Sequence, residues 1–273
     1  MNTLERQVGR LSGGRVGLRR PALGTLVEQT RLPTVLFLVA VILAWWALSK
    51  RLGQYLLPSP ERVLQGVLDL GASGELWVHV AATLYRVTLG FSLAALIALL
   101  AGFLVAQVPF ARMVVKDVTV ILNSMSVFVW IVLALIWFGL SDTAPIFTTF
   151  MVTLPVMLSN VIAGVESIDR KLLEMARIYK FSALDRFRTV AVPSMAPYLV
   201  AGMKVAFALA LRISVIAEIF GVSSGIGYMM NFSRDTLRTD MVFAWALVLI
   251  VVMVLVEKLL LDPADRRVNG WRH

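Results

Sequence analysis

The sequence predicts an all-α, polytopic membrane protein with six transmembrane helices, and three observations lead to this fold class. Of the 273 residues, 59% are hydrophobic and only 16% are charged, whereas soluble domains average about 45–50% and about 25%. The apolar residues are gathered into long runs, and about 20 such residues suffice to cross a bilayer. The basic residues fall mainly on one side of those runs. The excess apolar surface therefore has to face lipid.

Six apolar runs are expected to span the bilayer, with approximate ends. The first run is short and carries Trp45 and Trp46 near one end, as is typical of interfacial anchors. The stretch from Pro58 to Thr83 is amphipathic and too polar to cross. The expected spans cover residues 33–49, 84–106, 119–139, 143–163, 196–220 and 241–261.

The distribution of lysine and arginine predicts the orientation. Six precede the first span, two lie between the second and third, six lie between the fourth and fifth, and four lie at or beyond the end of the sixth, so 18 of 26 share one side. Because cytoplasmic loops carry the excess of basic residues, both termini are expected in the cytoplasm. The chain then divides into a basic tail over residues 1–32, a six-helix domain over 33–262 and a second cytoplasmic tail over 263–273.

The first tail is rich in arginine and glycine and has little apolar periodicity, so we expect a mobile segment that touches anionic headgroups. A cleaved signal peptide is not expected, because the first apolar run starts late and no small-residue cleavage pattern follows it. The net charge of +9 is explained by the basic residues of the segments that are expected to face the cytoplasm. No nucleic-acid partner is therefore expected.

Catalytic and metal chemistry are not expected. The chain has no cysteine and no Gly-x-x-x-x-Gly-Lys-Ser/Thr segment to bind ATP. Serine motifs occur at 221–225 and 71–74, but each would need a histidine base within reach. The two histidines, His79 and His273, both lie outside the expected spans. We therefore expect no catalytic residue, no metal site and no cofactor in this chain.

Residues 164–195 form the longest charged internal segment, and they are expected to fold as a helix–turn–helix. Asp169 or Ser167 can cap a first helix over 170–179. That helix carries an apolar stripe at helical spacing: Leu172, Leu173, Ala176 and Tyr179.

The second helix of this segment is expected to open at a capping box formed by Ser182 and Asp185. Pro193 and Pro197 are expected to end it and restart the chain into the fifth span. Two short helices with apolar and basic faces suit a docking element. The alternative is a solvated linker whose stripe rests on the bundle.

This segment resembles the EAA loop of bacterial ABC importer permeases, through a set of matched residues: Glu174, Met175, Ala176, Ser182, Phe187, Val190, Val192, Pro193 and Pro197. Glu174, Ala176 and Pro193 stand at the positions that match the family pattern. Met175 replaces its second residue, and Lys180 replaces the glycine of its turn. The turn must then form without the freedom of glycine at positive φ.

Other segments resemble the nitrate, sulfonate and taurine branch of these permeases. They are Trp130 with 137–142, Leu56 with 58–60 and Val63, and Ala217-Glu218 with 224–228. The match covers roughly residues 33–262. This chain departs from the family in the third span, where Ser126, Val127 and Val132 replace frequent prolines.

The resemblance implies a type I ABC importer (MetI-like) permease fold in the bacterial inner membrane. Its expected partners are a second copy of the chain, two cytoplasmic ATPase subunits that carry ATP and magnesium, and an extracytoplasmic substrate-binding protein. An outer gate is expected at Gly225 and Gly227. The residues expected to dock the ATPase are Glu174, Met175, Ala176, Arg177, Tyr179, Lys180, Ser182, Phe187 and Pro193.

The implied solute is a small organic or inorganic anion such as a sulfonate, taurine or nitrate, imported by alternating access. A heterocyclic vitamin or precursor is the alternative solute. A secondary transporter that works without ATP is a further alternative, but it predicts inverted repeats with broken helices at mid-membrane, and none is evident. An intramembrane enzyme is a third alternative, but the expected spans contain no histidine that could act as its base.

Polar residues inside the spans are candidates for the substrate path, because an unpaired charge in the membrane is expensive. Arg212 needs an aqueous cavity, an anion or a partner on another helix or protomer. Glu218 stands six residues further on and is not expected to pair with it, since the two lie on different helical faces. Lys204 can snorkel to the interface. Asn123, Ser126 and Asn160 complete the candidate path, with interhelical packing as their alternative role.

Overall fold

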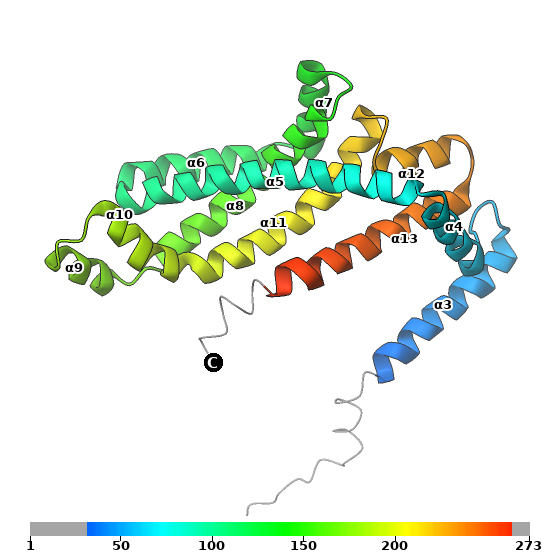
Figure 1. Cartoon of the computed structure of the whole chain (residues 1–273), viewed down its shortest axis with the longest axis horizontal. Helices are drawn as coiled ribbons and strands as arrows, with labels where there is room; N and C mark the ends of the chain where they lie inside the picture. Colours follow the sequence, from blue (N-terminus) through cyan, green and yellow to red (C-terminus); the bar gives the residue numbers. More distant parts are fainter. Residues whose placement is uncertain (1–31, 264–273) are drawn as a thin grey trace, which may run out of the picture. The chain divides into compact units, whose positions relative to one another are not determined.

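The computed structural model describes residues 32–263, and every regular element in that range is helical (Figure 1). Most of the two terminal tails expected from the sequence lies outside the described residues. The chain divides into two compact units at Leu52 and Gly53. In the first, α3 (Leu32–Leu52) is long and apolar enough to cross a membrane. The Lys50 ammonium lies 3.6 Å from the ring centre of Trp46, a cation–π contact at the end of that helix.

The second unit contains the remaining helices, and we describe it by itself. Its first half comprises α4 (Pro60–Ser73), α5 (Glu75–Gln107), α6 (Pro109–Ser124), α7 (Val127–Phe138) and α8 (Thr143–Glu166). Its second half comprises α9 (Arg170–Ile178), α10 (Ala183–Arg186), the π-helix η1 (Phe187–Ala191), α11 (Val192–Gly221), α12 (Ile226–Asp235), α13 (Thr239–Val256) and the π-helix η2 (Glu257–Leu261).

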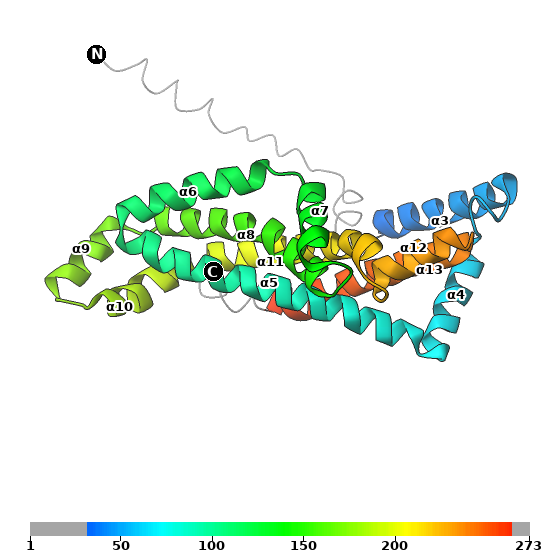
Figure 2. The same ribbon diagram turned by 90° about the horizontal axis from the view of Figure 1, so that it is seen from above.

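Helix α8 is the centre of this unit, because it packs against α5, α6, α7 and α11 (Figure 2). Small residues let the backbones approach closely, as is common in membranes, where helix association has no hydrophobic driving force. A Cβ atom built on Gly90 of α5 would lie 2.7 Å from the carbonyl oxygen of Ile146 in α8. One built on Gly202 of α11 would lie 2.6 Å from the Cβ of Asn160. Glycine is therefore required by packing at both positions.

The six predicted spans correspond to five helices long and apolar enough to cross a membrane and to one bent pair of helices. The expected continuous helix over 119–139 is wrong: the chain bends by 90° between α6 and α7. Met125 and Ser126 are both extended, with ψ of 134° and 143°, and the Ser126 carbonyl accepts the first hydrogen bond of α7, from Val129. Two extended residues suffice to turn the chain, and an apolar run does not reveal them.

The prolines of the charged segment also behave differently from the expectation. Pro193 and Pro197 do not end the second helix, because residues 183–221 continue as one helical rod. The amide of Val192 donates to the Phe187 carbonyl, five residues back. This wider π-turn accommodates Pro193, which has no N–H and whose ring would crowd an α-helical turn.

Replacing Gly90 by alanine tests the packing of α5 on α8. The added methyl would meet the backbone of Ile146 at 2.7 Å and Thr149 at 2.9 Å, so we expect the free energy of unfolding to fall by about 1–3 kcal/mol. The control is Gly71→Ala on α4, where no atom lies within 4 Å of the new methyl. Thermal unfolding in detergent measures both, and an unchanged midpoint for Gly90→Ala would contradict the packing.

Candidate functional site

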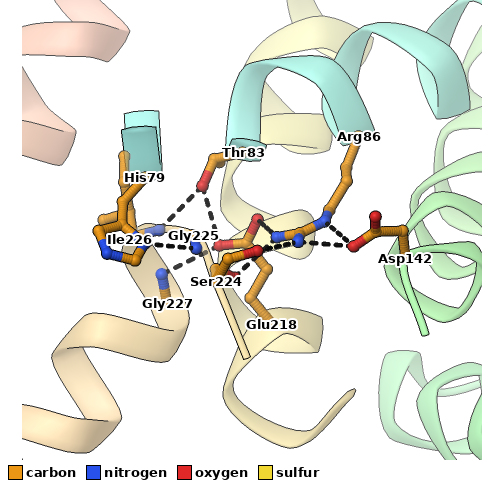
Figure 3. Close-up of polar contacts among 9 residues, drawn as sticks. All are labelled: His79, Thr83, Arg86, Asp142, Glu218, Ser224, Gly225, Ile226 and Gly227. Carbon is orange, nitrogen blue, oxygen red and sulfur yellow. Dashed lines mark hydrogen bonds and ion pairs between the residues drawn. The ribbon is translucent and has the colours of Figure 1, made fainter. Parts of the chain in front are cut away.

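The two ends of the bundle carry the candidate sites. The end with α9 and α10 is called the loop end, and the end where α12 begins is called the α12 end (Figure 1). At the α12 end, Arg86 of α5 is 1% exposed and lies between two carboxylates (Figure 3). Its Nη1 donates to Glu218 Oε1 at 2.9 Å, and its Nη2 donates to Asp142 Oδ1 at 2.7 Å.

The same guanidinium also holds the segment that precedes α12. Nη1 donates to the carbonyl of Ser224 at 2.8 Å, and Nη2 donates to its hydroxyl at 2.6 Å. Nε makes a further bond to Asp142 at 3.0 Å. An arginine has five N–H donors, and five hydrogen bonds are present, so its donor capacity is fully used.

The carboxylate of Glu218 is completely buried near the end of α11. Besides Arg86, it accepts hydrogen bonds from the Thr83 hydroxyl at 2.9 Å and from the Gly227 amide at 3.0 Å. A buried charge is tolerated only when it is paired and its remaining acceptor sites are filled. Glu218 meets both conditions, because a cation and two neutral donors surround it.

The first residues of α12 are fixed by the same cluster. A helix start leaves backbone amides without intrahelical partners. Here the amide of Gly225 donates to His79 Nδ1 at 3.1 Å, and that of Ile226 donates to Thr83 Oγ1 at 2.9 Å. Side chains of α5 and α11 therefore act as the cap of α12. We call these nine residues the clamp: His79, Thr83, Arg86, Asp142, Glu218, Ser224, Gly225, Ile226 and Gly227.

Both glycines expected at an outer gate belong to the clamp. Gly225 has a φ of 106°, a conformation that other residues rarely adopt. A side chain on Gly227 would overlap the carbonyl of Val215. Close packing excludes a side chain at both positions, since a Cβ atom on Gly225 would lie 2.5 Å from the Glu218 carboxylate, and the backbone conformation of Gly225 is a second reason for glycine there.

Sequence reasoning missed Arg86, the centre of the clamp. The sequence places Arg86 with the charges on the side opposite the basic loops, because it stands only two residues inside the approximate start of the second span. The structure corrects this: Arg86 is buried within the bundle, on a helix that begins at Glu75. The expectation that Glu218 and Arg212 do not pair is confirmed, since Glu218 pairs with Arg86.

At the loop end, α9 and α10 form the expected helix–turn–helix. Asp169 caps α9 by accepting from the Lys171 amide at 2.9 Å. The first half of the predicted capping box is present, because Ser182 accepts from the Asp185 amide at 3.1 Å; the Asp185 carboxylate accepts from the Ser182 hydroxyl at 2.6 Å. Lys180, which stands where a glycine was expected, has a φ of 53°.

The turn after α9 therefore forms in the left-handed region without glycine. Behind Lys180, the amide of Phe181 donates to the Ala176 carbonyl at 3.0 Å. This bond to a carbonyl five residues back is typical of a left-handed helix end. A non-glycine residue is strained in that region by roughly 1–2 kcal/mol.

The loop end exposes apolar side chains. Of the expected stripe, Ala176 is buried, whereas Leu172 and Tyr179 are exposed. Glu174 is exposed as well, and the side chain of Arg177 lies outside the described residues. Further exposed apolar side chains are Met175, Ile178, Phe181 and Leu184.

Two contacts tie this loop to α5. The Gln107 amide group donates to the Ala183 carbonyl at 3.0 Å. Phe187 of η1 packs edge-to-face on Phe103, with ring centres 4.9 Å apart. Pro193 follows at the start of α11. The loop is therefore attached to the bundle through α10 and η1, while α9 is largely exposed.

The remaining polar candidates do not form one site. Arg212 is exposed and has no hydrogen bond or ion pair within the described residues; it lines a groove of about 360 Å³ between α11 and α13. Lys204 lines the same groove and pairs with Asp262 at 2.9 Å. Asn123 and Ser126 are exposed at the bend between α6 and α7.

Asn160 packs against Gly202, and its amide group donates to its own helix at the Val156 carbonyl. No group of three or more metal-ligating side chains occurs within residues 32–263.

Comparison with known proteins agrees with this architecture. The family model described as binding-protein-dependent transport system inner membrane component matches residues 94–269. The chain is 33% identical over 226 residues to the aliphatic sulfonates transport permease protein SsuC of Escherichia coli, covering 82% of this chain and 84% of that protein. It is 25% identical to the taurine transport system permease protein TauC of Escherichia coli, covering 86% and 87% of the two chains.

The nitrate import permease protein NrtB of Synechococcus elongatus is 28% identical, covering 73% of this chain and 75% of that protein. Among solved structures, the inward-facing MetNI methionine ABC transporter matches with a TM-score of 0.59 at 20% identity. That match covers 70% of this chain and 94% of the other. The likeness confirms the predicted all-α, MetI-like fold.

Substitutions in the clamp should lower the free energy of unfolding by different amounts, depending on whether they leave a buried charge without its partner. Arg86→Met leaves Glu218 buried without its cation, so we expect a loss of about 3–5 kcal/mol in the free energy of unfolding. Glu218→Gln leaves Arg86 bonded to Asp142 and Ser224, and we expect a smaller loss of about 1–3 kcal/mol. Thermal unfolding in detergent ranks the two. The reverse order would contradict the central role of Arg86.

Proposed function

The chain belongs to the family of binding-protein-dependent transport system inner membrane components, so it is the permease subunit of an ABC importer, and we propose that it imports a small anion. In this family the ATPase is a separate subunit, and the permease is the non-catalytic membrane component. A secondary transporter independent of ATP is therefore set aside.

We propose that the α9–α10 loop docks the ATPase, with the loop end in the cytoplasm. The bias of basic residues supports this orientation, which also places both termini in the cytoplasm. Exposed Met175, Ile178 and Tyr179 offer an apolar contact surface, and exposed Glu174 adds a charge beside it. A loop that served only as a solvated linker would gain nothing from exposing these apolar side chains.

The observation that carries this mechanism is the continuous helical rod over residues 183–221. At about 1.5 Å per residue, 39 residues extend over roughly 58 Å, from the docking loop to the clamp. Glu218 near its far end bonds to α5 and to the first turn of α12. A displacement of α10 by the ATPase would therefore reach the opposite end of the bundle without crossing a flexible joint.

The partners follow from the same arrangement. Two copies of the chain would enclose a path between them, and two ATPase subunits, each with ATP and magnesium, would move the two loops. An extracytoplasmic binding protein would deliver the solute at the α12 end, near Gly225 and Gly227. The clamp bonds the start of α12 to Glu218 of α11. Helix α12 would therefore move together with α11 when access alternates.

The names of three relatives supply the proposed solute, because sulfonates and nitrate are anions and taurine carries a sulfonate group. Arg212 supports this choice, since it is an exposed cation at membrane depth without an internal partner in the described part of the chain. An arginine at that depth is usually functional. A heterocyclic vitamin or precursor remains the second candidate; it would not require the Arg212 charge.

Replacing Glu174 by lysine tests the docking loop. Glu174 is exposed, so folding should not change, whereas reversal of a charge at a protein contact should weaken ATPase binding at least tenfold. Co-purification with the cognate ATPase measures this binding, and uptake should be lost. The control is Asp235→Lys at the exposed α12 end. Full ATPase recovery with Glu174→Lys would refute the docking assignment.

Arg212→Leu tests the path. We expect uptake to fall roughly tenfold or more because the anion loses its countercharge, while ATPase association remains as in the wild type. Arg212→Lys keeps the charge and should retain part of the activity. Normal uptake by Arg212→Leu would remove this residue from the path.

A further inference from the structure

A second groove lies at the loop end of the bundle, apart from the groove at Arg212. Its volume is about 510 Å³, and it opens between α5, α8, the α10–η1 segment and α11. Its lining is apolar except for a single cation, Arg188 of η1. The apolar lining includes Leu99, Leu100, Phe103, Leu184, Val192 and Met195.

The groove lies where the apolar spans give way to the polar loop. Leu99 and Leu100 are in the last three turns of α5, which ends at Gln107. Gln107 in turn bonds to Ala183 of the docking loop. Leu99 and Leu100 are exposed on a helix that is long and apolar enough to cross a membrane, so we infer that the apolar part of the groove faces hydrocarbon and its loop side lies at headgroup depth.

The cation that lines this groove lacks a countercharge. Arg188 is exposed and has no ion pair or hydrogen bond of its side chain within residues 32–263. Two residues before it, Arg186 holds a buried Nε without a hydrogen-bond partner among those residues. A guanidinium favours phosphate oxygens, which can accept two of its donors at once. Basic pockets between membrane helices on the cytoplasmic side bind anionic headgroups in the same way.

We propose that this groove binds an anionic membrane phospholipid, with one acyl chain along α5 and α11 and the phosphate at Arg188. A phospholipid supplies an acyl chain for the apolar lining and a phosphate for Arg188, at the depth of the headgroups. Bound there, it would contact Leu184 and Arg188 and so join the docking loop to the bundle beyond the two direct contacts with α5. The link to coupling and the cytoplasmic side of the groove rest on the proposed function; the contacts that would hold the lipid do not.

Native mass spectrometry of the full-length chain in detergent tests the binding without any ATPase. Equal amounts of palmitoyl-oleoyl phosphatidylglycerol and phosphatidylcholine are added to each variant. We expect the wild type to retain phosphatidylglycerol roughly fivefold better. Arg188→Gln should bring the ratio close to one, and Leu100→Trp, which fills the groove without changing charge, should lower the retention of both lipids.

Arg234→Gln is the matched control, since Arg234 is an exposed cation at the other end of the bundle. It should retain the wild-type ratio. An unchanged preference in Arg188→Gln would overturn the headgroup assignment. Displacement of phosphatidylglycerol by equimolar glycerol phosphate would overturn the role of the acyl chain. Retention of a second copy of the chain in place of lipid, lost with Leu100→Trp, would replace the lipid by a protein contact and overturn the proposal.

Discussion

The buried ion pair between Arg86 and Glu218 constrains most of the bundle. In a low dielectric, each charge is tolerated only while its partner and its hydrogen bonds stay in place. Arg86 comes from α5 and Glu218 from α11, and the guanidinium also reaches Asp142 before α8 and Ser224 before α12. Four segments that are distant in sequence are thereby held in one register. None of them can slide or rotate independently without breaking a hydrogen bond or ion pair of the buried Arg86.

The two ends of the bundle differ in how their polar groups are satisfied. At the α12 end, donors and acceptors satisfy one another, so the clamp has little capacity left for a ligand. At the loop end, apolar side chains and the cation Arg188 stay exposed, and Gln107 and Phe103 of α5 contact the loop. The first arrangement favours rigidity, and the second favours contact with other molecules. A single rod over residues 183–221 connects the two.

Much of this structure could be predicted from the sequence, for identifiable reasons. Long apolar runs mark spans because a bilayer demands them, and the Ser182–Asp185 capping box is a local pattern that depends on four residues. The bend at Ser126 was not predictable from hydropathy, since two extended residues leave an apolar run unchanged. The partner of Glu218 was not predictable either. Its choice among several arginines depends on helix packing, and only the depth of Arg86 inside the bundle makes it the partner.

The turn at Lys180 was predictable in part from the sequence. The resemblance to the EAA loop indicated that this turn needs positive φ, and the structure has it at Lys180 with φ 53°. The strain there is small enough to be offset by the bond from Phe181 to Ala176. A family glycine can thus be replaced where the added side chain points into solvent, in contrast to Gly227, whose neighbours leave no space.

The π-helix before Pro193 also determines the direction in which the α9–α10 loop faces. A π-turn holds one residue more than an α-turn, so it is equivalent to a single inserted residue that the rod absorbs without breaking. Deleting one residue from 187–191 would restore ordinary α-helical winding and turn everything before it by about 100° around the rod. The loop would keep its sequence but face another direction. In this protein, the direction in which the α9–α10 loop faces therefore depends on the length of a five-residue segment as well as on the residues of the loop.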